Sequence, residues 1–140
     1  MTLFRTALMG GAFFACGVCA ETEIENTVSI ELNATQPSDS GCTLSFLATN
    51  GHQNDVRKAV YEAVLFDENH QVDRLMLFDF GELPTKRPRV RQFMVPDLAC
   101  ANLSLILING ANQCDGQGLP DRACIDGLHV GSRVNTEVQG

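Results

Sequence analysis

The cysteines are the residues whose spacing says most about the chemistry of this chain. The 140 residues contain six of them. Two fall within positions 1–20, and the others are Cys42, Cys100, Cys114 and Cys124. Zinc-binding cysteines usually come as C-x2-C pairs, and redox-active pairs have the same short gap. The last three cysteines are spaced C-x13-C-x9-C, which fits neither pattern. An even number of widely spaced cysteines instead predicts two structural disulfide bonds.

The segment CDGQGLPDRAC, from Cys114 to Cys124, is rich in the residue types that could form a metal-binding loop. A calcium loop needs closely spaced oxygen ligands and a terminal carboxylate. Asp115, Gln117 and Asp121 do not follow that spacing, and His129 does not complete a zinc pattern. We therefore expect no metal ion and no cofactor, and we interpret the segment as a loop closed by a disulfide.

A basic segment, TKRPRVR, holds four of the ten Lys and Arg residues of the chain: Lys86, Arg87, Arg89 and Arg91. On a strand, the three arginines would share a face and could bind a carboxylated glycan, a phosphate or an acidic protein surface. The alternative is a charged edge strand that discourages pairing with other chains, a role that Pro88 also suits. We favour the edge strand and keep the anionic ligand as an alternative function.

The chain contains no recognisable catalytic motif, with neither G-x-S-x-G nor H-E-x-x-H nor a glycine-rich phosphate loop before a helix. His52, His70 and His129 are far apart in the sequence, and we expect all three to lie at the surface. The sequence therefore predicts a protein that is not an enzyme. A hydrolase that uses His129 or His70 with a neighbouring Asp is the remaining enzymatic alternative.

Residues 1–20 have the layout of a secretory signal peptide. One charge, Arg5, precedes an apolar stretch, small residues precede Ala20, and the composition turns polar at Glu21. This pattern predicts cleavage after Ala20, a folded domain at 21–140, and a periplasmic or secreted protein. Export also suits the predicted disulfides, which persist in oxidising compartments.

No membrane attachment or nucleic-acid binding is expected. The apolar stretch is shorter than the about 20 residues that a spanning helix needs, and no later segment approaches that length. The residues before Cys16 and Cys19 match a lipoprotein cleavage box poorly, which argues against a lipid anchor. The net charge of −7 at pH 7 repels nucleic acid.

Alternation of apolar and polar residues predicts an all-β fold. Two-residue periodicity is clearest at 27–34 and 41–49, while 59–66 is apolar on both parities, as in a central strand. A helix is the alternative for 59–66, because its Ala, Glu and Leu residues are good helix formers, but its Val, Tyr and Phe residues favour a strand. A hairpin turn is expected at 67–71, and Asn109-Gly110 reads as a turn that ends a strand. Strands are predicted at 27–34, 41–49, 59–66, 72–80, 89–95, 103–110 and 127–138. Seven short strands indicate a single immunoglobulin-like β-sandwich.

Strand direction predicts how the cysteines pair. If successive strands alternate in direction, Cys42 and Cys100 begin strands at one end of the sandwich, and Cys114 and Cys124 meet at the other end. We therefore predict disulfides Cys42–Cys100 and Cys114–Cys124. The parity of Cys100 differs from that of Leu103, Leu105 and Leu107, so this pairing requires a bulge or bend near Cys100.

The stretch FDENHQVDRLMLFDFGELP, continuing to RPRVRQFMVPDLAC, resembles a group of short exported alphaproteobacterial proteins without an assigned activity. The resemblance implies a periplasmic or secreted protein and carries over no functional residues. The strand pattern also resembles small bacterial immunoglobulin-like modules that act as binding or accessory domains. We expect a protein-interaction or envelope accessory module whose partner is another envelope or secreted protein. A sheet edge or the loops beside Cys114–Cys124 are the expected contact surfaces.

Overall fold

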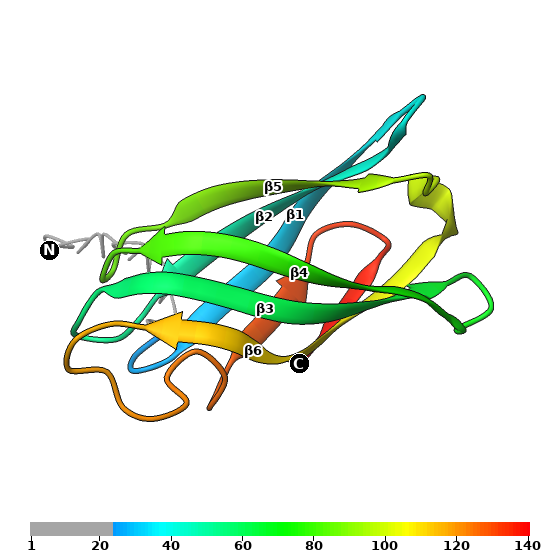
Figure 1. Ribbon diagram of the computed structural model, residues 1–140. Coiled ribbons are helices and arrows are strands. Elements are labelled where there is room, and N and C mark those ends of the chain that lie inside the picture. Colours follow the sequence, from blue (N-terminus) through cyan, green and yellow to red (C-terminus); the bar gives the residue numbers. More distant parts are fainter. Residues whose placement is uncertain (1–23) are drawn as a thin grey trace, which may run out of the picture.

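The computed structural model describes residues 24–140, and the expected signal peptide lies outside them. The described residues form two four-stranded sheets packed face to face (Figure 1). The all-β sandwich predicted from the sequence is therefore confirmed. The strands are β1 (Val28–Ser38), β2 (Gly41–Asn50), β3 (Val56–Asp67), β4 (Val72–Leu83), β5 (Arg89–Pro96), β6 (Leu103–Asp115), β7 (His129–Ser132) and β8 (Glu137–Gln139).

The two sheets have the orders β5-β2-β1-β7 and β4-β3-β6-β8. The long strands pair antiparallel, whereas the short strands β7 and β8 run parallel to β1 and β6. One sheet therefore ends in β5 and the other in β4. These two edge strands lie next to each other along one side of the sandwich (Figure 1).

The segment 127–138 forms two strands in different sheets rather than the single strand expected, which brings the total to eight. The chain crosses from one sheet to the other between β7 and β8. Arg133 donates its backbone N–H to the carbonyl of Leu32 on β1, and the Thr136 hydroxyl donates to the carbonyl of Leu103 on β6. The valines of this segment still pack against the core, so the apolar pattern was real although the strand was not continuous.

The dipeptide Asn109-Gly110 does not form a turn, so that prediction was wrong. Strand β6 continues through it to Asp115 and stays paired with β3, with register shifts that leave Asn109 and Asn112 without a partner in the ladder. A β-bulge absorbs one extra residue in this way and bends the strand without reversing it. Because the pairing with β3 continues beyond Gly110, Cys114 still lies within β6, opposite Ala59.

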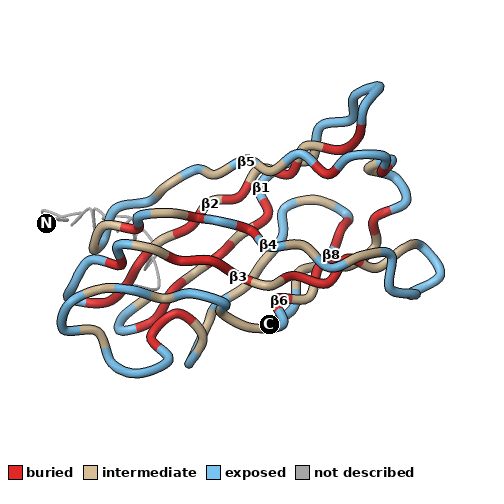
Figure 2. Tube along the Cα trace, viewed as in Figure 1, coloured by how far each residue is buried: buried red, intermediate tan, exposed pale blue. Residues whose placement is uncertain are grey.

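The inner faces of both sheets meet in one apolar core. Buried residues follow the middle of the strands, and most hairpin and loop residues are exposed, although His52, Ala123 and Cys124 are buried in loops (Figure 2). An aromatic cluster fills its centre, with Phe78 stacked on Phe93 at 4.6 Å between ring centroids and Tyr61 edge-on to Phe80 at 5.5 Å. Phe46 contacts three of these rings from β2. Segment 59–66 is a strand, as predicted, and it lies within β3 between β4 and β6.

Both predicted disulfides are present, Cys42–Cys100 with Cα atoms 5.1 Å apart and Cys114–Cys124 at 5.9 Å. The first joins the start of β2 to η1, just before β6, and the second joins the end of β6 to the loop before β7, so they lie toward opposite ends of the sandwich. The expected irregularity near Cys100 is also confirmed. Residues Cys100–Asn102 form a short 3-10 turn, η1, and the register against β3 shifts at Ser104. Because of this shift, Ile106 and Ile108 face the core, while Leu105 and Leu107 do not.

Candidate interaction surfaces

The basic segment spans the β4–β5 connection and the start of β5. The edge position of β5, on which the charged-edge interpretation depends, is confirmed. The arginines do not all share a face, because β5 begins at Arg89 and Arg87 precedes it. Lys86 and Arg87 are exposed, whereas Arg89 and Arg91 are half-buried. Lys86 and Arg87 are therefore open to a ligand, and Arg89 and Arg91 are open only in part.

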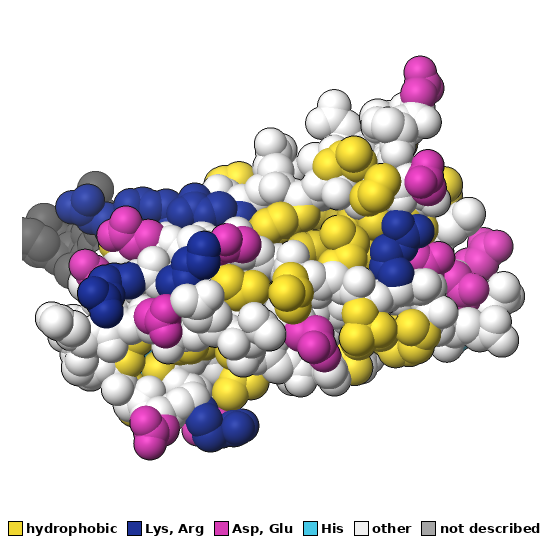
Figure 3. All heavy atoms as spheres, viewed as in Figure 1, with side chains coloured by type: hydrophobic (Ala, Val, Ile, Leu, Met, Phe, Trp, Pro, Cys, Tyr) yellow, Lys and Arg dark blue, Asp and Glu magenta, His cyan; other side chains and the backbone are white. Residues whose placement is uncertain are grey.

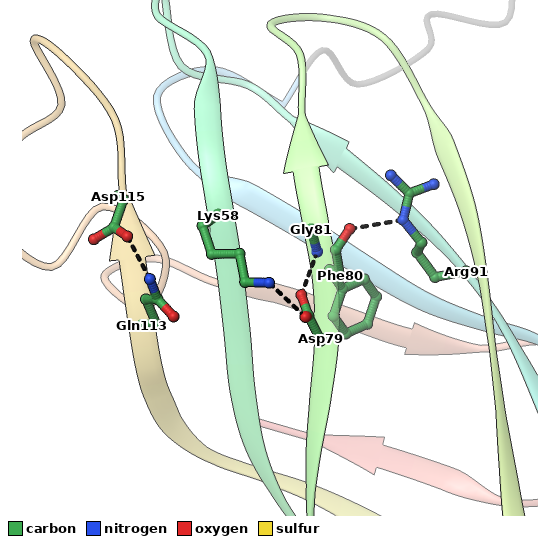
Figure 4. Close-up of polar contacts among 7 residues, drawn as sticks. All are labelled: Lys58, Asp79, Phe80, Gly81, Arg91, Gln113 and Asp115. Atoms are coloured by element: carbon green, nitrogen blue, oxygen red, sulfur yellow. Dashed lines mark hydrogen bonds and ion pairs between the residues drawn. The ribbon is translucent and has the colours of Figure 1, made fainter.

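Arg91 is bound to the neighbouring edge strand. Its Nε donates to the carbonyl oxygen of Phe80 at 2.6 Å (Figure 4). Its Nη2 donates to the carbonyl oxygen of Glu82 at 3.0 Å. In the other direction, Arg74 on β4 donates from Nη1 to the carbonyl oxygen of Pro96 on β5 at 2.6 Å. Arginines from both strands thus occupy carbonyl groups that an incoming strand would otherwise use, which protects this side of the sandwich from edge pairing.

Polar groups also cover the end of the β4-β3-β6-β8 sheet nearest the Cys114–Cys124 loop. Lys58 on β3 and Asp79 on β4 form an ion pair at 2.6 Å, while Gln113 donates to Asp115 on β6 (Figure 4). The hydrogen bond from Lys58 lowers the pKa of Asp79 below its ordinary value, and the backbone N–H of Gly81 contributes in the same direction. At neutral pH this end of the sheet is charged and exposed to solvent.

The disulfide-closed loop is held firmly by buried polar side chains. The hydroxyl of Tyr61 donates to the carbonyl of Cys124 at 2.7 Å, and burial raises the pKa of Tyr61. His52 is only 5% exposed, and its Nε2 lies 2.7 Å from the carbonyl oxygen of Ala123. The expectation that all three histidines lie at the surface was therefore wrong for His52. Asn50 holds the β2–β3 loop, which contains His52, in place. Its side-chain Nδ2 donates to the carbonyl oxygen of Asn54, and its Oδ1 accepts a hydrogen bond from the backbone N–H of His52.

A depression beside η1 offers little chemistry, and no metal site is found in residues 24–140. The described residues contain no group of three His, Cys, Asp or Glu side chains that could hold a metal ion. One depression of about 510 Å³ lies between η1 and the β7–β8 connection. Its lining includes Thr35, Leu103 and Val134 but no charged side chain, and its cysteine, Cys100, is in a disulfide. A reaction that needs a general acid or base has no candidate group there.

A surface that the sequence analysis did not single out covers the rest of the β4-β3-β6-β8 sheet. Its strands place apolar side chains on the outer side, in register across three strands. Phe66 pairs with Val72 on one side and Leu105 on the other, and Val64 pairs with Leu75 and Leu107. Leu77 extends the surface along β4. We call this surface the outer apolar face, and its members are Val64, Phe66, Val72, Leu75, Leu77, Leu105 and Leu107.

Three members of the outer apolar face are strongly exposed: Val72 at 56%, Leu75 at 59% and Leu77 at 56%. The space-filling view shows hydrophobic side chains over this part of the sheet (Figure 3). The signal for it was in the sequence, because 59–66 and 103–108 are apolar on both parities. We took the first as a central strand, which was right, but a central strand can have an uncovered outer side when no layer packs on it.

Comparisons with known proteins add no relative to this description. No protein-family model, no curated protein sequence and no solved structure matches the chain. Within residues 24–140, no helix has the length and hydropathy that crossing a membrane would require.

Proposed function

We propose that this protein is an exported protein-interaction module without enzymatic activity, whose partner is another envelope or secreted protein. The observation that carries the proposal is the outer apolar face, displayed on a rigid sandwich stapled by two disulfides. Contiguous apolar surface on a folded domain commonly marks a contact site. The two disulfides favour an oxidising, non-cytoplasmic compartment, and periplasmic or secreted localisation extends that inference with the signal-peptide pattern.

The immunoglobulin-like assignment is part of this proposal. Its support is the strand order, since β1-β2-β5 corresponds to strands A-B-E of that fold and β6-β3-β4 to strands F-C-C′. The disulfide Cys42–Cys100 joins the start of β2 to the turn before β6, close to where such domains link strands B and F. Domains of this architecture serve many functions, so the fold is compatible with a binding role but does not specify one.

The contact surface we propose differs from those expected from the sequence. The β4–β5 edge is occupied by Arg91 and Arg74, and the Cys114–Cys124 loop is bound to Tyr61 and His52. Both features favour stability over recognition. The side chains of the outer apolar face point away from the core and are not part of it. The face therefore has no corresponding role in holding the fold together.

Site-specific photo-crosslinking in the native host tests this function. A photoreactive phenylalanine analogue at Leu77 should crosslink to one specific protein. The same analogue at Val90, which is 61% exposed on the outer side of the other sheet, should not. Equal products from both positions, or none from Leu77 under several growth conditions, would reject the interaction module.

A second candidate function is anionic-ligand binding by Lys86, Arg87 and Arg89. The observation that favours it is a row of basic side chains along the start of β5 on an otherwise acidic protein (Figure 3). Replacing these three residues with Ser should abolish binding to immobilised polyphosphate or polygalacturonate, and wild-type binding should weaken with salt. Arg91 is left intact because it holds β4. Unchanged binding by the triple variant would exclude this candidate.

A further inference from the structure

We propose that the outer apolar face binds a protein segment whose apolar side chains are flanked by Lys or Arg. This inference rests on the proposed interaction function and adds the chemistry of the partner. Two rows of apolar side chains cross three hydrogen-bonded strands, Val72-Phe66-Leu105 and Leu75-Val64-Leu107. With strands about 4.8 Å apart, three strands make a surface about 10 Å across, which matches one amphipathic helix or a pair of strands.

The charges around the outer apolar face are acidic. Glu62 lies opposite Leu77 in the ladder, Glu137 lies opposite Leu105, and Asp73 is the residue bulged from β4. The β3–β4 hairpin adds Asp67 and Glu68, and Figure 3 shows acidic side chains beside the hydrophobic ones toward this hairpin. The surface therefore combines an apolar centre with a negative rim.

Among the carboxylates of this rim, only Asp73 has an ion-pair partner within residues 24–140, whereas Glu62, Asp67, Glu68 and Glu137 have none. Arg74 pairs with Asp73 through Nε, so this pair has no net charge, and its Nη1 donates to the carbonyl oxygen of Pro96. Lys58 is paired with Asp79 farther along the sheet. Glu62 accepts a hydrogen bond from Asn109, an uncharged donor that leaves its charge in place. The exposed field at the outer apolar face is consequently negative.

Charge complementarity selects among the occupants of such a surface. A second copy of this chain would bring two acidic rims together, and like charges across an interface cost several kcal/mol. An anionic lipid surface would be repelled for the same reason. A segment with apolar residues between basic ones satisfies both parts of the surface, and its encounter would be accelerated by the opposite charges.

Two synthetic peptides serve as probes. One is a 14-residue helix of Leu and Lys with its leucines on one face, and its twin has Glu in place of every Lys. We expect the Leu/Lys peptide to bind at least about tenfold more tightly and to shift the NMR amide signals of β3, β4 and β6. Binding should fall about tenfold in the double variant Leu75→Ser, Leu77→Ser and stay unchanged in the control Val90→Ser, Met94→Ser, since Val90 and Met94 are exposed apolar residues of β5.

Several outcomes would overturn the inference. Equal binding of the two peptides, or shifts confined to β5, would show that the acidic rim does not select the partner. Concentration-dependent dimers that Leu75→Ser, Leu77→Ser abolishes would assign the face to a second copy. Flotation with phosphatidylglycerol vesicles would assign it to lipid. A Leu77 crosslink to a partner with an acidic contact segment would refute only the partner chemistry, whereas failure of both the peptide and the crosslink would refute the interaction function itself.

Discussion

The outer sides of the two sheets differ sharply, although their inner sides are alike. On the β5-β2-β1-β7 sheet, β2 turns Thr43, Ser45 and Thr49 outward, and Gln92 of β5 donates to the hydroxyl of Ser45. The apolar residues Leu47, Val90 and Met94 also lie on this outer side, but polar residues separate them along their strands. On the β4-β3-β6-β8 sheet the corresponding positions carry the outer apolar face. A sandwich needs apolar side chains only between its sheets. Folding therefore requires apolar side chains on the inner sides and leaves the composition of the outer sides free.

Replacing an inner-side aromatic should have the largest effect. Phe46 is fully buried and contacts the rings of Phe78, Phe80 and Phe93. We expect Phe46→Ala to lower the free energy of unfolding by about 3–5 kcal/mol, because it leaves a cavity among these rings. Urea denaturation measures this loss. Thr43→Ala, on the outer side of the same strand, is the control and should change it by less than about 0.5 kcal/mol.

Removing the disulfide at the end of β6 should have the next largest effect. The double variant Cys114→Ser, Cys124→Ser opens a short loop, and we expect the free energy of unfolding to fall by about 3 kcal/mol. Tyr61→Phe, which removes only the hydrogen bond to Cys124, should cost about 1 kcal/mol. Equal losses in thermal denaturation of the two proteins would mean that the hydrogen bond, not the crosslink, holds the loop.

The Lys58–Asp79 ion pair, at the polar end of the β4-β3-β6-β8 sheet, should contribute little to the free energy of unfolding. The pKa of Asp79 is lower in the folded state than in the unfolded state, so its stabilisation is present at neutral pH and is lost as the pH falls through the folded-state pKa. Because Lys58 and Asp79 are 39% and 52% exposed, solvent screening keeps the contribution below about 1 kcal/mol. The difference in unfolding free energy between wild type and Asp79→Asn, followed from pH 7 to pH 2, should shrink to zero.

Substitution on the outer apolar face should have the smallest effect on stability. Leu75→Ser or Leu77→Ser is expected to change the free energy of unfolding by less than about 0.5 kcal/mol, since both side chains are already more than half exposed. Binding of the hydrophobic dye ANS should nevertheless decrease. A loss of stability as large as that of Phe46→Ala would show that Leu75 and Leu77 belong to the core, and that the outer side of the β4-β3-β6-β8 sheet is not distinct from its inner side.

Much of the scaffold could be predicted because it depends on local periodicity. Alternation identified β1 and β2, and the direction of successive strands was enough to pair the four cysteines. The strand 127–138 was wrong because its valines reach the core from two different sheets, a pattern that alternation within one strand also produces. Asn109-Gly110 was wrong for a related reason, since pairing with β3 continues across a bulge and overrides the turn preference of the dipeptide.

The candidate surfaces were less predictable than the scaffold. Nothing local in the sequence shows that Arg91 binds the carbonyls of Phe80 and Glu82, or that His52 is buried against the carbonyl of Ala123. The apolar pattern of 59–66 predicted a strand with two apolar sides. Whether the second side is covered depends on what else packs there, and that is a property of the whole fold.

By itself the sequence determined the β class, because two-residue alternation acts within short stretches of chain. It also determined the disulfide pairing, because the number and alternating direction of the strands place each cysteine at one end of the sandwich. Only the tertiary structure decided which sheet each strand joins, which arginines remain available, and which apolar side chains stay in contact with water. These depend on contacts between residues far apart in the chain, and burial is determined by how those segments pack.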